Sequence, residues 1–98
     1  MSDEGDIAAG ADDSGVRMPP ATFEFLIHTL FTQALMALGR IPNPITKKSI
    51  TNIATARHFI DTLDMLEEKT RGNLTGEEQR LLEEIQHQLR TMYLEAKS

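Results

Sequence analysis

A chain of 98 residues has room for one domain, and the absence of cysteine excludes disulfide bonds and thiolate metal sites. The formal net charge of -5 comes mostly from residues 1–18, which hold five acids and one base, whereas the rest of the chain holds ten acids and nine bases. Because this remainder is nearly neutral, it offers no basic surface for a phosphate backbone, and we expect no nucleic-acid partner.

The N-terminal segment is acidic and rich in small residues. Residues 1–20 hold too few apolar side chains to offset the entropy lost when a backbone is ordered. We therefore expect a disordered acidic tail over residues 1–20 and a helical domain over residues 21–98. The start of the chain, Met1 to Asp6, lacks the basic and apolar regions of a secretory signal, so a cytoplasmic protein is expected.

The first helix is expected from Phe23 to Leu38. Thr22 can cap its N-terminus with a hydroxyl oxygen, and Gly39 can adopt the left-handed conformation that ends a helix. At about 100° per residue, an apolar arc covers roughly half of the circumference. Its members are Phe23, Leu26, Ile27, Leu30, Phe31, Ala34, Leu35, Ala37 and Leu38.

Two apolar residues of this helix fall outside the arc. Phe25 and Met36 lie near Thr29 and Thr32 on the opposite side, which predicts contact on more than one face and makes these four the candidate interface residues. The segment is too short and too polar to cross a bilayer, so no membrane association is expected. A central buried helix and the seam of a homo-oligomer remain as compatible interpretations.

The segment from Arg40 to Ile50 is expected to be a connection without helix, because Pro42 and Pro44 disfavour helix in the residues before them. Three isoleucines, Ile41, Ile45 and Ile50, make it unusually apolar for a loop. We therefore expect the connection to lie across the helices and cover part of their core.

Two further helices follow, from about Asn52 to Thr70 and from Gly76 to Ala96. Gly72 is placed to end the second helix, and Thr75 with Glu78 forms a capping box that begins the third. A stop and a start this close together predict an αα-hairpin. The expected fold is all-α, with three helices, the first packed on the hairpin.

Both hairpin helices have one apolar face. In the second helix, Arg57, Asp61, Asp64 and Glu68 share the face opposite the apolar one, with Arg57 and Asp61 spaced for an ion pair. The apolar faces consist of Ile53, Ala56, Phe59, Ile60, Leu63 and Leu66 in the second helix and Leu81, Leu82, Ile85, Leu89, Met92, Tyr93 and Ala96 in the third.

No constellation of residues predicts catalysis, a metal site or a cofactor. His58 with Asp61 and Glu83 with His87 supply too few ligands for a metal ion, and His28 lies on the polar side of its helix. The sequence contains no nucleophile in a strained turn and no phosphate-binding loop. We expect neither an enzyme nor a resident cofactor.

From Phe23 onward several motifs stand out together. They are Thr32-Gln33-Ala34-Leu35, Leu38-Gly39, Ile41-Pro42-Asn43-Pro44 with Thr46, Ala56, Ile60-Asp61-Thr62-Leu63, Lys69-Thr70 and Gly72-Asn73-Leu74-Thr75 with Glu77 and Glu78, Leu89-Arg90 and Tyr93. With these motifs the chain resembles a bacterial family of uncharacterised proteins, the domain of unknown function numbered eighteen forty-four. The family more often has an acidic residue near Thr51 and Asn52, which leaves the N-cap of the second helix open. The resemblance implies a bacterial, cytoplasmic, helical protein and supplies no catalytic residues.

Two functional hypotheses follow. The first is a non-enzymatic interaction module that forms a homo-oligomer, or binds a protein partner, through its first helix, because a chain this short is not expected to bury both faces of that helix. The alternative is a helical protein that binds a small ligand or metal between the first helix and the hairpin, near His28 and Gln33.

Overall fold

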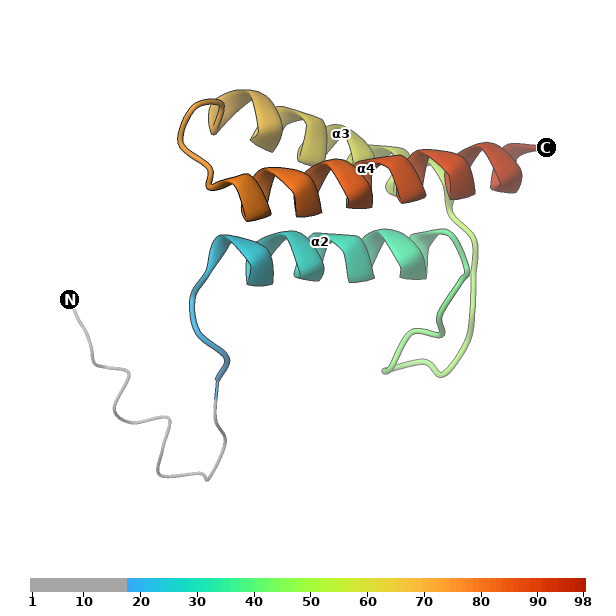
Figure 1. Ribbon diagram of the computed structural model, residues 1–98. Helices are drawn as coiled ribbons and strands as arrows, with labels where there is room; N and C mark the ends of the chain where they lie inside the picture. The colour runs from blue at the N-terminus through green and yellow to red at the C-terminus, as the bar shows by residue number, and fades with distance from the viewer. Residues whose placement is uncertain (1–17) are drawn as a thin grey trace.

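The fold is a bundle of three helices, as the sequence predicts (Figure 1). The computed structural model describes residues 18–98, within which α2 spans Phe23–Ala37, α3 spans Ile53–Lys69 and α4 spans Gly76–Lys97. All three pairs of helices are in contact, and α3 runs opposite to α2 and α4. The predicted acidic tail lies, as far as residue 17, outside the described residues.

Local side-chain caps set the helix boundaries. Thr22 Oγ1 accepts a hydrogen bond from Phe25 N at 3.0 Å, which confirms the predicted start of α2. Asn52 Oδ1 accepts from Thr55 N at 3.0 Å and so caps α3 at the position that the sequence left open. The capping box of α4 is confirmed, because Thr75 N donates to Glu78 Oε1 at 2.8 Å and Glu78 N donates to Thr75 Oγ1 at 3.1 Å.

One core lies between the three helices. The alanines Ala34 of α2 and Ala56 of α3 have no exposed surface, and small residues at a helix contact allow the two axes to approach closely. The hairpin supplies the larger side chains, among which Leu63, Leu82 and Leu89 are fully buried. The buried apolar residues are Ile27, Ala34, Ala37, Leu38, Ala56, Ile60, Leu63, Leu82, Ile85 and Leu89.

The connection between α2 and α3 does not cover the core, so that prediction was wrong. Ile45 is 87% exposed and Ile50 is 65% exposed, while Ile41 is half-buried. The segment folds back on itself at one end of the bundle (Figure 1). Its apolar residues therefore do not reach the core, although their composition suggested that they would.

Hydrogen bonds within the connection explain this conformation. Asn43 Oδ1 accepts from Ile45 N at 2.8 Å, Lys47 N donates to Asn43 O at 2.7 Å, and Asn43 N donates to Lys48 O at 2.9 Å. These bonds satisfy the backbone locally and close a tight loop. The positions of the isoleucines then follow from the loop rather than from their hydrophobicity.

The two ends of the connection are held together. Leu38 and Thr51 form an antiparallel β-bridge, and Asn52 N donates to Ala37 O at 2.7 Å. Gly39 has a φ of +75°, as expected of a left-handed helix stop, and its backbone passes close to the Thr51 side chain. The end of α2 is thereby fixed against the start of α3.

Substitution of Leu63 or Leu89 by alanine is expected to lower the free energy of unfolding by about 2–5 kcal/mol, because both side chains are fully buried in the hairpin. Urea denaturation measures the change. Leu94→Ala serves as the control, since Leu94 is 63% exposed and its truncation is expected to cost about 0.5 kcal/mol or less. Equal effects at the two kinds of position would contradict the assigned packing.

Alanine at the two left-handed glycines is expected to give unequal losses of stability. Gly72 has a φ of +86° and open space around it, so Gly72→Ala should cost about 1 kcal/mol for the backbone alone. At Gly39 a Cβ atom would also lie 2.5 Å from Thr51 Oγ1, so Gly39→Ala should cost more. Thermal unfolding of the two variants side by side tests this order.

Candidate functional site

The four predicted interface residues lie on the side of α2 that faces away from the core, and we call this set the outer face of α2. Phe25 is 44% exposed, Thr29 and Thr32 are exposed, and Met36 is half-buried. The opposite side of the helix carries its buried residues, Ile27, Ala34 and Ala37. The hairpin therefore covers one side of α2 and leaves the other open within the described residues.

Leu26 extends the exposed apolar surface beyond the predicted set. The sequence places it in the buried arc, yet it is 43% exposed, because it lies at the edge of the arc where neither hairpin helix covers it. Side chains of consecutive helix residues point about 100° apart, so Leu26 lies beside the outer face of α2 and not on it.

The hydroxyl of Thr29 does not make the outer face polar. Thr29 Oγ1 donates to the carbonyl of Phe25 in the preceding turn at 2.9 Å. Its hydrogen-bonding capacity is thus directed at its own helix, as is common for threonine within helices. The outer face of α2 therefore combines two apolar side chains with two threonines, of which Thr29 is already hydrogen-bonded within the helix.

Charge also separates α2 from the other two helices. Between Phe23 and Ala37 the only charged side chain is Glu24. It lies in the first turn, where a negative charge interacts favourably with the helix dipole. In contrast, α3 and α4 carry acids and bases along their exposed sides, with ion pairs Arg57–Asp61 at 3.4 Å and Arg90–Asp64 at 2.6 Å. The first of these confirms the predicted pair in α3.

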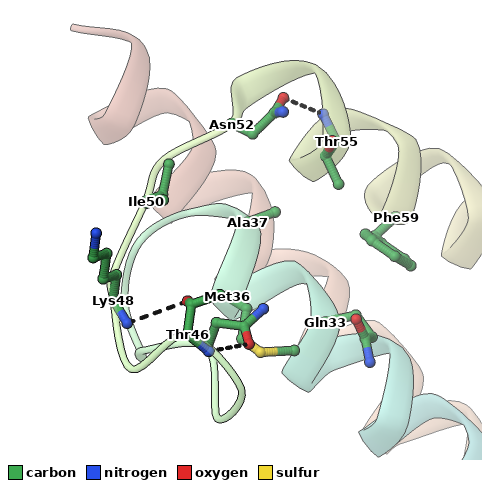
Figure 2. Close-up of a pocket in the computed structure, with 10 residues that line it drawn as sticks. Gln33, Met36, Ala37, Thr46, Lys48, Ile50, Asn52, Thr55 and Phe59 are labelled. Atoms are coloured by element: carbon green, nitrogen blue, oxygen red, sulfur yellow. Dashed lines mark hydrogen bonds between the residues drawn. The ribbon is translucent and has the colours of Figure 1, made fainter.

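A pocket of about 320 Å³ adjoins the outer face of α2 (Figure 2). It is lined from three directions, by Gln33, Met36 and Ala37 of α2, by the connection, and by the start of α3 with Phe59. Its lining is completed by Asn43, Thr46, Lys48, Ile50, Asn52 and Thr55. The structure places Gln33 at the pocket, as the ligand hypothesis expects, and does not place His28 there.

Sequence reasoning missed a polar contact inside the hairpin. Gln86 of α4 is only 3% exposed, and its Nε2 donates to Asp64 Oδ1 at 2.9 Å and to Glu67 Oε1 at 3.2 Å. Gln79 Nε2 also donates to Glu67, and Arg90 completes the network through Asp64. The sequence placed Asp64 on the face of α3 opposite the apolar one. The structure shows that Asp64 also lies at the contact between α3 and α4.

The spacing of α4 contains a signal for this contact. Gln86 follows Leu82 by four residues and precedes Leu89 by three, so it lies on the apolar stripe of the helix. A polar residue at such a position requires hydrogen-bond partners from the facing helix. Only the relative position of α3 and α4 shows that these partners are Asp64 and Glu67.

The histidines do not come together with other ligands. His28, His58 and His87 are exposed, and residues 18–98 contain no group of three histidine, aspartate or glutamate side chains close enough to hold a metal ion. Beside α4, polar interactions with Tyr93 and then with Asp61 raise the pKa of Arg57 above its ordinary value. Like other arginines, it is a cation throughout the physiological pH range.

The comparison with known families agrees with the resemblance in the sequence. The family model described as Domain of unknown function (DUF1844) matches residues 20–95, which include all three helices and the connection. The chain belongs to this family. Searches of curated proteins and of solved structures find no match. Within the described part of this family member, no helix is both long and apolar enough to span a membrane.

Gln86→Glu is expected to lower the free energy of unfolding by about 3 kcal/mol or more at pH 7, because the introduced carboxylate would be buried against two others. Burial beside two carboxylates raises the pKa of the introduced carboxyl above the ordinary glutamate value of about 4.3. The penalty should therefore shrink as the pH falls from this raised pKa toward 4.3, and should be absent below it.

Gln86→Leu is the matched control for this substitution. It removes the same hydrogen bonds without adding a charge and leaves Asp64 and Glu67 partly open to water, so it should cost about 1 kcal/mol or less. Denaturation at pH 4 and pH 7 compares the two variants. A loss of stability in Gln86→Glu that is the same at both pH values would contradict the proposed contact.

Proposed function

We propose that this family member is a non-enzymatic interaction module of the bacterial cytoplasm, which pairs with a second copy of itself through the outer face of α2. The observation that carries the proposal is the half-exposed Phe25 on the outer face of α2, which contains no charged side chain. The lack of cysteine fits a reducing compartment. A module of this kind would work through its contacts.

A second copy suits this surface because a twofold interface must be complementary to itself. In such an interface the same patch lies on both subunits, so a charged patch would meet its own charge. The outer face of α2 consists of one aromatic, one thioether and two threonine side chains and brings no like charges together. The charged exteriors of α3 and α4 satisfy this condition less readily.

The size of the face predicts the strength of the association. A helix of 15 residues is about 22 Å long, so two copies of α2 side by side bury an interface at the small end of the usual range. Phe25 supplies the kind of aromatic anchor that dominates such interfaces. We therefore expect a reversible dimer with a dissociation constant in the micromolar range.

The composition of the pocket supports a role without catalysis. Lys48 is the only titratable side chain among its lining residues, so the pocket holds no pair of groups for general acid and base chemistry. A small-ligand-binding role is the second candidate, favoured by the position of Gln33 at this pocket. A metal has no comparable support in residues 18–98.

Phe25→Glu is expected to weaken dimerisation tenfold or more, because a carboxylate from each copy would replace the aromatic anchor, and about 1.4 kcal/mol corresponds to a factor of ten. Sedimentation equilibrium of the full chain at micromolar concentrations measures the association. A wild-type protein that sediments as an 11.0 kDa monomer throughout would contradict the proposal.

Met65→Glu is the control for this experiment. Met65 is 47% exposed, close to the 44% of Phe25, but lies on α3. The substitution adds the same charge and removes a similar exposed apolar side chain without touching α2. Equal weakening by both substitutions would show that net charge, and not the outer face of α2, governs the association.

A further inference from the structure

Acids and bases are unevenly distributed along this chain. Between Glu24 and Asp61 there is no acidic residue, and the bases in this stretch are Arg40, Lys47, Lys48 and Arg57. The segment of residues 1–16 has the opposite composition, with five acids and no base. The chain therefore carries two segments of complementary charge, separated by the length of α2.

The connection presents both positive charge and apolar surface. Ile45 and Ile50 are the most exposed large apolar residues of the helical domain, and Lys47 and Lys48 lie between them. We call these four residues the connection ridge. Neither lysine forms an ion pair with a carboxylate of residues 18–98. The lysines of the ridge suit a negatively charged partner, and its isoleucines suit an apolar side chain. A segment that carries both would fit the ridge.

The backbone of the ridge is held in one conformation. Lys47 has a φ of +64°, which is uncommon for a residue other than glycine, asparagine or aspartate. The bond from Lys47 N to Asn43 O fixes it there. A fixed loop loses little conformational entropy when it binds a partner.

We propose that the connection ridge binds the acidic N-terminal segment of the same chain, through Asp3, Glu4, Asp6 and Ile7. In this proposal the carboxylates bind the two lysines, and Ile7 fills the pocket that Lys48 and Ile50 help to line (Figure 2). Single exposed ion pairs contribute little, so the apolar contact is needed to hold the segment in place.

The length of the segment permits this contact. Ile7 precedes Met18 by eleven residues, which extend to about 36 Å at most, whereas α2 is about 22 Å long. The segment can therefore run along α2 from its N-terminus to the ridge at the opposite end of the bundle (Figure 1). A second chain is not required.

The positions of the lysines distinguish bound from unbound segments. Lys69 ends α3, at the end of the bundle where α2 begins (Figure 1). The connection, which carries Lys47 and Lys48, lies at the other end of the bundle. A segment without a preferred site is expected to meet lysines at both ends, whereas a bound segment is expected to meet Lys47 and Lys48.

Carbodiimide cross-linking of the full chain, followed by mass spectrometry of the monomeric fraction, tests the proposal. We expect carboxylates of residues 3–6 to link to Lys47 and Lys48 more often than to Lys69 or Lys97. Salt should remove this preference, because the screening length falls from about 10 Å at 0.1 M to about 3 Å at 1 M. Links mainly to Lys69, or links spread evenly over the lysines, would overturn the proposal.

A pair of variants separates specific binding from general attraction. Ile7→Ser keeps every carboxylate and should lose the preference for Lys47 and Lys48, since it removes the side chain placed in the pocket. Val16→Ser is the matched control, because it changes the other branched apolar residue of the segment and should keep the preference. A preference that survives Ile7→Ser would overturn the proposal.

Discussion

In a bundle of three helices, each helix has only two neighbours, and two neighbours cover about half of its circumference. For α3 and α4 this coverage matches most of the sequence, because most of their apolar residues lie on one side and their charged residues on the other. Met65 and Leu94 are single exposed exceptions. For α2 the coverage does not match, since apolar side chains continue around the helix from Ile27 to Phe25. The exposed surface of α2 follows from this geometric limit, and so does the proposal that a second copy covers it.

Polar contacts fix the relative positions of the helices, which the apolar core alone leaves free. Apolar side chains tolerate sliding and rotation, whereas Gln86 must find Asp64 and Glu67 or remain buried without partners. This contact defines how far α4 is shifted along α3. On the other side of the bundle, the bridge between Leu38 and Thr51 defines where α2 ends relative to α3.

The parts of this fold that could be predicted are those decided by neighbours in sequence. The cap at Thr22, the left-handed glycines and the box of Thr75 with Glu78 depend on a few consecutive residues, and the structure has all of them. Ile45 was misjudged because its exposure depends on how the connection folds, and Gln86 was missed because its burial depends on a distant helix. For Ile45, a loop closed by Asn43 turned an apolar residue outward; for Gln86, carboxylates of α3 made burial of an amide possible. The positions on the outer face of α2 were predictable, but the pocket beside it required the folded connection.

The bridge at the base of the connection has a consequence for how this domain can vary. Because Leu38 and Thr51 already meet, the chain between them is a closed loop whose ends do not depend on its length. Lengthening a flexible loop costs little, about 0.6 kcal/mol for each doubling. The exposed part of the connection after Lys48 can therefore accept added residues while the three helices keep their arrangement.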